Sequence, residues 1–303
     1  MKYQGVRTKG ILVHPKPAIG MLQSIRTKYW PLIKSLQTSL LLATGIAGYL
    51  SAHPMYTMGR SIVALVGSLF LAISGSTVLN MWYDRDIDAI MQRTCNRPLA
   101  SQRITPNQAL LLGVVLAVFG VGWSLILSPL YGLVVFTGLF IDVFIYTLWL
   151  KRRSGWSIVL GGISGGMPVL AGRTLAMGRI DWIGITLLLA ILFWIPTHIL
   201  TFNMRYYDDY QAAHIPTITS NYGLRATRLI IAISSVLAAV AMSLASFWVG
   251  TSAGILRLLI VLGTGLLILA LTSIVRPSNK LNFSLFKYAS IYMLGAMILL
   301  AIH

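Results

Sequence analysis

The stretch Ser61–Asp88 reads SIVALVGSLFLAISGSTVLNMWYDRDID and decides the fold class. Residues 61–82 are apolar or small, and a helical run of about 20 such residues crosses the ~30 Å hydrocarbon core of a bilayer. Three carboxylates, those of Asp84, Asp86 and Asp88, follow this run directly. We therefore predict a membrane-spanning helix that ends in a cluster of acidic groups.

The composition extends this prediction to the whole chain. Of its 303 residues, 56% are hydrophobic and 10% are charged, with a mean hydropathy of +0.78, whereas soluble globular proteins carry about 25% charged residues. The formal charge of +17 suggests nucleic acid at first sight. The basic residues, however, lie in short clusters between apolar runs, which argues against nucleic acid as a partner and favours the lipid bilayer.

Nine apolar runs are long enough to span a membrane. Helices are expected, because a spanning segment must satisfy its own backbone hydrogen bonds, and a β-barrel would alternate over strands of ~10 residues. The predicted fold class is an all-α integral membrane protein with nine transmembrane helices. The expected spans are 33–50, 61–82, 107–127, 130–149, 157–175, 181–202, 226–249, 253–274 and 283–302.

The basic residues predict the orientation in the cell (plasma) membrane. All but four of the 24 Lys and Arg residues lie in the N-terminal tail or after the second, fourth, sixth and eighth spans. By the positive-inside rule the N-terminus and both acidic clusters are cytoplasmic, and nine spans put the C-terminus outside. We expect a basic tail over residues 1–32, without a cleavable signal peptide, and a single membrane domain over residues 33–303.

A short internal repeat links two parts of the chain. Asn80-Met-Trp-Tyr83 and Asn203-Met-Arg-Tyr206 each end an apolar run, the second and the sixth, and each precedes acidic residues. This placement predicts two pseudo-repeated four-helix halves with a ninth helix appended. Halves related in this way usually form a site at their interface.

The first acidic cluster has the spacing of a metal site. Asn80, Asp84 and Asp88 are four residues apart, so on a helix of 3.6 residues per turn they form one stripe, while Asp86 points elsewhere. Mg²⁺ prefers oxygen ligands and commonly bridges carboxylates to substrate phosphates. The stripe is therefore a candidate Mg²⁺ site. The alternative is a solvated helix end whose carboxylates pair with neighbouring arginines.

The second acidic cluster supplies Asp208 and Asp209 as further candidate metal ligands. Tyr210 belongs to the same cluster, and Tyr146 and Tyr206 are expected at a similar depth. These rings can line an acceptor pocket or stabilise positive charge. Each alone is equally typical of the aromatic belt at a membrane interface.

Basic residues beside the acidic stripe predict a diphosphate site. Arg93 and Arg97 lie four residues apart, and the planar guanidinium group suits phosphate oxygens. Arg103 fits an ordinary positive-inside loop. Lys151 and Arg152, after the fourth span, are either topology signals or further phosphate ligands.

At this point the residues resemble a known family. The run Asn80–Leu99, NMWYDRDIDAIMQRTCNRPL, resembles the first signature of the UbiA superfamily of intramembrane prenyltransferases, in particular of its protoheme IX farnesyltransferase branch. Residues 151–154 (KRRS) and 161–168 (GGISGGMP) resemble the central loop and helix of that branch. Residues 209–216 (DYQAAHIP) resemble its second signature. The resemblance covers roughly residues 30–302.

The resemblance implies nine helices around a central cavity, two Asp-rich loops, Mg²⁺ as cofactor and an allylic diphosphate as donor. In this branch the donor is farnesyl diphosphate, and the farnesyl group passes to a vinyl group of protoheme IX (haem b), giving haem O. Metal and arginines stabilise the leaving diphosphate. We expect Asp84, Asp88 and Asp209 to be the catalytic carboxylates.

The acceptor end departs from the branch pattern. Residues 195–199 read IPTHI where the branch usually has PPHFW, and residues 167–169 read MPV where it usually has MPP. His198 is either a ligand of the haem iron or a structural hydrogen-bonding residue next to a proline kink. It is retained here as a candidate substrate-binding residue.

Two other functions remain open at this stage. One is prenyl transfer to a quinone precursor or a glyceryl phosphate by another member of the superfamily. The other is a transporter or a non-catalytic assembly factor. Transport sites lie near the membrane midplane, whereas these acidic clusters lie at helix ends among arginines, which attract a phosphate and repel a cation.

Overall fold

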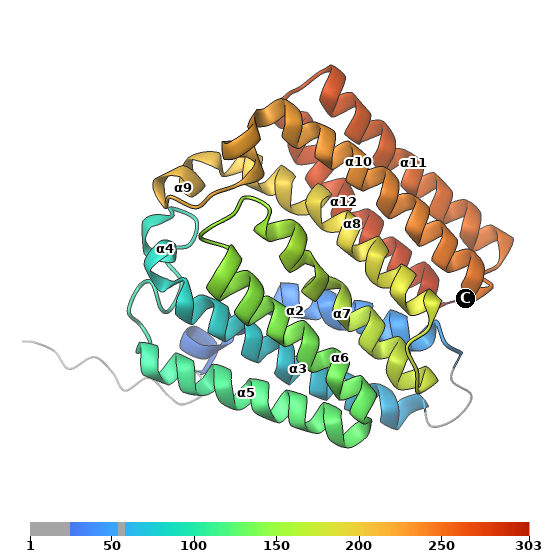
Figure 1. Cartoon of the computed structure of the whole chain (residues 1–303), viewed down its shortest axis with the longest axis horizontal. Helices are drawn as coiled ribbons and strands as arrows, with labels where there is room; N and C mark the ends of the chain where they lie inside the picture. The colour runs from blue at the N-terminus through green and yellow to red at the C-terminus, as the bar shows by residue number, and fades with distance from the viewer. Residues whose placement is uncertain (1–24, 54–57, 303) are drawn as a thin grey trace, which may run out of the picture.

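The computed structural model describes residues 25–53 and 58–302, and that part of the chain is helical without any strand (Figure 1). Of the tail expected over residues 1–32, residues 1–24 lie outside the described residues. The helices are η1 (Ile25–Tyr29), η2 (Trp30–Ile33), α2 (Ser35–Leu50), α3 (Met58–Tyr83), α4 (Arg85–Ile90), α5 (Pro106–Leu127), α6 (Pro129–Phe140), η3 (Ile141–Leu150), α7 (Ser157–Met177), α8 (Trp182–Arg205), α9 (Tyr207–Ala212), α10 (Ile218–Val249), α11 (Ala253–Val275) and α12 (Asn279–Ala301).

The membrane class is confirmed, but the count of nine spans is not. Within the described residues, eight helices are long and apolar enough to cross a bilayer, and α6 with η3 forms one of them, Pro129–Leu150. The first expected span corresponds to α2, which has 16 residues. At 1.5 Å per residue α2 is about 24 Å long, short of a full crossing.

The start of α2 explains its length. Lys34 adopts a left-handed conformation with φ 44° and separates the 3₁₀ turn η2 from α2. The Thr38 hydroxyl donates to the Ile33 carbonyl at 2.6 Å and holds this break. Leu32 and Ile33 are buried against Val78 of α3 and neighbouring apolar side chains, so the end of the expected tail is part of the packed bundle.

Five of the long helices, α5, α8, α10, α11 and α12, begin at a side-chain cap. Thr105 and Gln108 form a capping box at α5, and the Asp181 carboxylate accepts from the Gly184 N–H at α8. α10 begins eight residues before the expected span at 226, because Thr217 and Ser220 form a second capping box there. Gly223, with φ 81°, then bends the helix within its first two turns.

The packing of the helices follows the predicted repeat. α3 packs along α5 as α8 packs along α10, and α5 meets α6 as α10 meets α11. The short helices α4 and α9 follow α3 and α8 and lie next to each other at one end of the bundle (Figure 1). α12 packs against α8, α11 and α2. The two acidic clusters therefore meet at the same end of the molecule.

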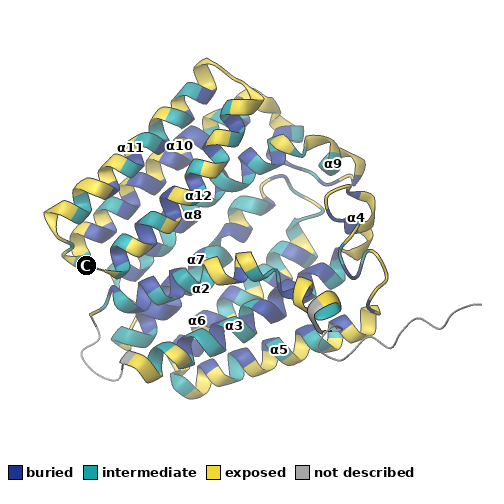
Figure 2. Cartoon of the chain, turned by 180° about the vertical axis from the view of Figure 1, so that it is seen from behind, coloured by how far each residue is buried: buried dark blue, intermediate teal, exposed yellow. Residues whose placement is uncertain are grey.

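The burial pattern fits a protein surrounded by lipid. Figure 2 shows exposed residues along the outer faces of α5 and α11 and buried residues toward the middle of the bundle. The exposed faces are apolar; they include Phe119 and Ile126 of α5, and Val261 and Leu271 of α11. In water such a surface would be a large exposed apolar patch, so the bilayer is the solvent that this surface requires.

The two halves touch through glycines on α2 and α7. A Cβ on Gly172 would lie 1.9 Å from the carbonyl oxygen of Gly45, and a Cβ on Gly48 would lie 2.0 Å from that of Val169. Small residues allow such close helix approach within membranes. This contact fixes the distance between the halves and hence the shape of whatever lies between them.

We expect Gly172→Ala to destabilise the protein, because its added methyl group forces α2 and α7 apart. Overpacking of this kind costs about 1–3 kcal/mol. The measurement is thermal unfolding of the purified protein in detergent. Gly122→Ala on α5 is the matched control, since a Cβ there meets nothing within 4 Å. Equal melting temperatures for the two variants would contradict the close contact between the halves.

Candidate active site

A cavity of about 210 Å³ lies between the two halves, at the end that carries α4 and α9. Its wall combines residues of α2, α3, α4, η3, α7, α8 and α9 with the loops after α4, η3 and α9. Apolar side chains, among them Ile158, Ile199 and Phe202, share this wall with polar ones. The charged and polar lining residues are Lys34, Gln37, Thr77, Asn80, Asp88, Arg93, Arg97, Asp142, Tyr146, Lys151, Ser157, Asn203, Tyr210 and Thr217.

The acidic stripe sits at the corner where α3 gives way to α4. The backbone bonds Asp84 N–H to Asn80 C=O (3.0 Å) and Asp88 N–H to Asp84 C=O (2.8 Å) carry the helical spacing through this corner. Asn80 and Asp88 both line the cavity, while Asp84 is fully buried behind it. The structure thus puts these three side chains on one stripe.

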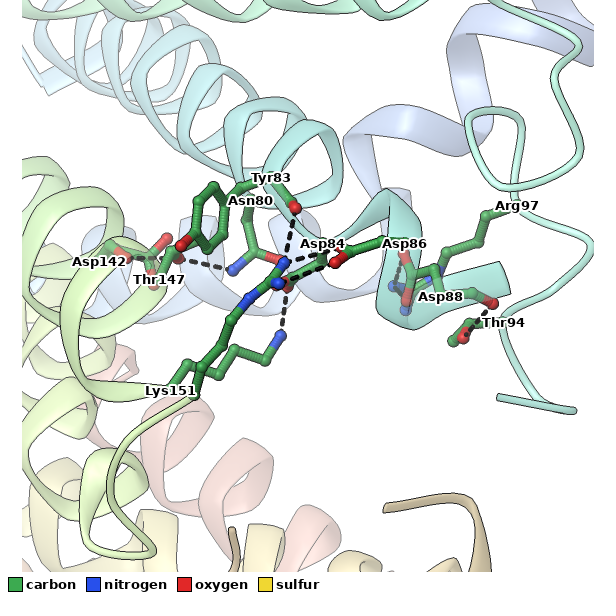
Figure 3. Close-up of polar contacts among 11 residues, drawn as sticks. Asn80, Tyr83, Asp84, Asp86, Asp88, Thr94, Arg97, Asp142, Thr147 and Lys151 are labelled. Carbon is green, nitrogen blue, oxygen red and sulfur yellow. Dashed lines mark hydrogen bonds and ion pairs between the residues drawn. The ribbon is translucent and has the colours of Figure 1, made fainter. Parts of the chain in front are cut away.

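Each carboxylate of the stripe has a basic partner (Figure 3). Arg97 Nη1 donates to both oxygens of Asp88 at 2.8 Å. Lys151 Nζ forms an ion pair with Asp84 Oδ2, while Asp84 Oδ1 is buried without a hydrogen-bond partner. Charges buried at such depth are tolerated only when they are paired. Of the candidate diphosphate ligands, Arg97 and Lys151 are therefore held against the stripe.

Asp86 lies outside the cavity, 59% exposed, and pairs with Arg152. Arg152 donates to its two oxygens at 2.7 and 2.8 Å and to the Tyr83 carbonyl at 2.9 Å. The hydrogen bond from Arg152 lowers the pKa of Asp86, and the same bond raises the pKa of Arg152. Arg152, a candidate substrate ligand from the sequence, does not line the cavity; it ties the α3–α4 corner to the loop after η3.

Asp208 and Asp209 of the second acidic cluster do not join the acidic stripe to form one set of metal ligands. Asp208 is exposed, and Asp209 accepts from the backbone N–H groups of Gln92 and Arg93 at 3.3 Å each. Neither carboxylate belongs to the cavity wall of the described chain. The predicted five-ligand metal set is therefore divided, because α9 directs Asp209 toward the backbone of the loop after α4.

The tyrosines fall into two groups. Tyr146 and Tyr210 line the cavity. Burial raises the pKa of Tyr210, so its hydroxyl stays protonated and can donate a hydrogen bond. Tyr206 lies outside the wall, under Arg93, whose guanidinium carbon is 5.6 Å from the Tyr206 ring and 4.9 Å from the Phe202 ring. Arg93 thus packs on these two aromatic rings and also lines the cavity.

His198 does not line the cavity. Its ring is stacked between Trp194 and Phe286, with centroids 4.8 and 4.6 Å away, and its Nδ1 lies 3.2 Å from the Ser290 hydroxyl. Both ring faces are covered, and one ring nitrogen is occupied. Of its two predicted roles, this environment favours the structural one.

Several polar lining residues were not assigned by the sequence analysis, among them Asn203, Asp142 and Lys34. Asn203 is buried with neither side-chain atom hydrogen-bonded; the Asn-Met-Xaa-Tyr repeat was a signal for it. Asp142 stands alone in an apolar run, a signal for a functional carboxylate. Lys34 lay within a basic tail, and nothing in the sequence separated it from the topology residues.

The oxygen atoms of the acidic stripe are of the kind that binds a hard divalent cation. Among the described residues, no three His, Cys, Asp or Glu side chains converge on one point. The stripe instead offers two carboxylates and an amide, and the buried Oδ1 of Asp84 has no partner. Oxygen atoms of this kind suit Mg²⁺, which completes its shell with water and substrate phosphates rather than with an all-protein cage.

The chain is similar to known proteins over most of its length. Residues 41–293 match the model of the UbiA prenyltransferase family. The chain is 39% identical over 206 residues, 68% of this chain and 69% of its relative, to the protoheme IX farnesyltransferase of Korarchaeum cryptofilum (strain OPF8).

Two solved structures share the fold. One, from work on digeranylgeranylglyceryl phosphate synthase, has a TM-score of 0.77 at 18% identity and covers 92% of this chain and 98% of its own. The other, a UbiA homolog from Archaeoglobus fulgidus bound to DMAPP and Mg²⁺, has a TM-score of 0.67 at 13% identity, with coverages of 91% and 100%.

We expect Lys151→Met to destabilise the protein strongly, because it leaves the fully buried Asp84 carboxylate without its cationic partner. Breaking a buried pair from one side costs about 3–5 kcal/mol. The measurement is thermal unfolding in detergent. The double variant Asp84→Asn/Lys151→Met should recover most of the loss, and Arg103→Met, at an exposed site, should stay near wild type. A double variant as unstable as Lys151→Met would refute the pairing.

Proposed function

This chain belongs to the UbiA prenyltransferase family, and we propose that it transfers the farnesyl group of farnesyl diphosphate to a vinyl group of protoheme IX, giving haem O. It is a multi-pass membrane enzyme of the prenyltransferase class. One observation carries the proposal: a single cavity between the halves is lined by the acidic stripe, its basic partners and an apolar wall. The acceptor is taken from the name of the curated relative.

The basic residues of the wall are proposed to hold the donor diphosphate. Arg93, Arg97 and Lys151 line the cavity within one small region, and their charges stabilise the negative charge that develops on the leaving diphosphate. The guanidinium groups add two-pronged hydrogen bonds that an ammonium lacks. Asn203 contributes an amide whose donors and acceptor are otherwise unused.

Asn80, Asp84 and Asp88 are proposed to hold Mg²⁺. When bound, the ion polarises phosphate oxygens and neutralises charge on the leaving group. The carboxylates are now neutralised by Lys151 and Arg97. A divalent cation would neutralise the two carboxylates, and the two basic side chains would then be available to pair with the anionic diphosphate.

The apolar part of the wall is proposed to hold the start of the isoprenoid chain. Ile158, Ile199 and Phe202 line the cavity and exclude water from the electron-deficient allylic carbon. The rings of Phe202 and Tyr146 present π faces that stabilise positive charge. A volume of about 210 Å³ is small for two large substrates, so both are proposed to extend from it into the bilayer.

The finer location is also part of the proposal. The N-terminus and both acidic clusters are placed on the cytoplasmic side of the cell (plasma) membrane, and the C-terminus outside. The distribution of Lys and Arg supports this orientation, as does the common end of the bundle that α4 and α9 share.

The acceptor is tested by product analysis. We expect the purified protein, given Mg²⁺, farnesyl diphosphate and protoheme IX, to form haem O, identified by mass after pigment extraction, and we expect the same pigment in cells that express it. Matched reactions replace protoheme IX by an aromatic quinone precursor or by a glyceryl phosphate. Prenylation of either of those compounds, with protoheme IX left unchanged, would assign the chain to a different branch of its family.

We expect EDTA to abolish turnover, and Asp84→Ala or Asp88→Ala to abolish it in protein that still folds, because each variant removes an oxygen ligand of the proposed ion. Asp86→Ala is the control; its carboxylate lies outside the cavity, and it should lose at most a few-fold. Initial rates of product formation decide the matter. Full activity in EDTA, or equal losses in all three variants, would remove the metal from the stripe.

We expect Arg97→Lys to raise KM for farnesyl diphosphate or to lower kcat by about 10-fold, because Lys keeps the charge and loses the paired donors. Arg103→Lys is the control, since Arg103 donates to the Asn96 carbonyl and the Ser101 hydroxyl at an exposed site. Steady-state kinetics measure both. Similar kinetics for the two variants would mean that the diphosphate lies elsewhere.

A further inference from the structure

Asp142 is the one carboxylate of the cavity wall that has no place in the proposal above. It lies in the first turn of η3, inside the membrane-spanning segment Pro129–Leu150. It is half-buried and lines the cavity together with Asn80 and Thr77. An ionisable side chain inside a spanning helix is costly, and such a residue marks function unless a structural partner accounts for it.

The structural partners do not account for Asp142. Asp84, Asp86, Asp88 and Asp181 each form an ion pair with Lys or Arg. Asp142, within the described chain, has no basic group at ion-pair distance; its Oδ2 accepts a hydrogen bond from the neutral hydroxyl of Ser76. The carboxylate is therefore anchored without being neutralised.

The charged groups around Asp142 belong to the same cavity. Lys34, directly before α2, and Lys151, after η3, attract this carboxylate, and Asp84, between α3 and α4, repels it. Both lysines line the cavity, and Lys151 is one of the groups proposed to hold the leaving diphosphate.

The local backbone holds Asp142 in this place. η3 is a ten-residue π-helical segment, and π-helical turns occur frequently at functional sites. The Thr147 hydroxyl donates to the Asp142 carbonyl at 2.7 Å and accepts from Asn80 Nδ2 at 2.8 Å. Asp142 is thus tied through its backbone to the acidic stripe (Figure 3).

Prenyl transfer needs a proton acceptor at this location. The allylic C–O bond breaks, and the diphosphate leaves with the electron pair. The allylic carbon then bonds to the terminal vinyl carbon of the acceptor, which leaves a cation on the adjacent carbon. For haem O that cation is closed by a bond to water, which then loses a proton and becomes the hydroxyl group of the product. This step releases one proton.

We propose that the Asp142 carboxylate is the base that takes this proton. The inference rests on the proposed function in one respect only, that a prenyl group is transferred in this cavity; an aromatic acceptor or a glyceryl phosphate hydroxyl also releases one proton. The other carboxylates do not serve. Asp84 and Asp88 are assigned to Mg²⁺ when the donor is bound, and without it they are paired with Lys151 and Arg97.

The test compares Asp142→Asn with Asp142→Glu, and uses Asp86→Asn as the matched control at a carboxylate outside the cavity. Each purified protein is assayed for kcat, for KM of farnesyl diphosphate and for farnesol released without transfer. General-base catalysis contributes about 10²–10⁴-fold. We therefore expect Asp142→Asn to lose at least 100-fold in kcat with KM within about 3-fold, Asp142→Glu to recover at least a tenth of wild-type kcat, and Asp86→Asn to stay within about 3-fold.

The amount of farnesol released distinguishes a base from a residue with a purely structural role. In Asp142→Asn the donor still binds and ionises, so the ratio of farnesol to prenylated product should rise above that of wild type. Product formation within about 3-fold of wild type would overturn the proposal. An unchanged farnesol ratio with parallel losses in donor binding would overturn it equally.

Two further measurements keep the outcomes separate. Equilibrium binding of radiolabelled farnesyl diphosphate shows whether each variant is folded. If Asp142→Asn does not bind the donor, Asp142→Ser is tested in its place. If neither variant binds it, Asp142 has a structural role and the proposal is overturned. The assay uses whichever of protoheme IX, an aromatic quinone precursor or a glyceryl phosphate the wild type prenylates. An inactive protoheme IX reaction then contradicts the proposed acceptor and leaves the test of Asp142 in force.

Discussion

A carboxylate inside a lipid-embedded bundle is costly unless it is neutralised, and this constraint organises the acidic stripe. Transfer of an isolated carboxylate into a medium of low dielectric constant costs several kcal/mol or more, so the acidic stripe at the end of α3 requires cations close by. Arg97 and Lys151 supply them from the loops after α4 and η3. These ion pairs join distant parts of the chain at one wall, and the groups that stabilise the fold are also those suited to a metal ion and a diphosphate.

The same constraint explains the arrangement of the halves. The glycines of α2 and α7 allow the halves to touch, while the short helices α4 and α9 cover the common end and pack through Ile87, Met91 and Ile215. Asp209 contributes to this cover rather than to the ligand stripe, since it accepts the backbone N–H groups after α4. The second acidic cluster therefore positions the first loop, and the polar cavity opens beneath it.

Much of this architecture was predictable, because rare residues carry strong signals in an apolar chain. Long apolar runs gave the helices, the four-residue spacing gave the stripe, and the Asn-Met-Xaa-Tyr repeat gave the two halves. The length of α2 was not predictable, since it depends on the left-handed conformation of Lys34. The basic partner of each carboxylate was not predictable either, because sequence spacing does not show that Arg152 pairs with Asp86 or that Lys151 pairs with Asp84.

The contrast between donor and acceptor follows from the same physics. A diphosphate and its metal are recognised by charge, and charged residues are only 10% of this chain, so each cluster stands out in the sequence. A large, mostly apolar acceptor is recognised by shape and by aromatic contacts, and these use the residue types that also face lipid. His198 illustrates the difficulty, because its place between Trp194 and Phe286 is decided by packing of α8 against α12. Asp142 is the exception that charge makes visible. A half-buried carboxylate inside a membrane-spanning segment requires a function or a partner, and the one side-chain hydrogen bond it has among the described residues comes from a hydroxyl.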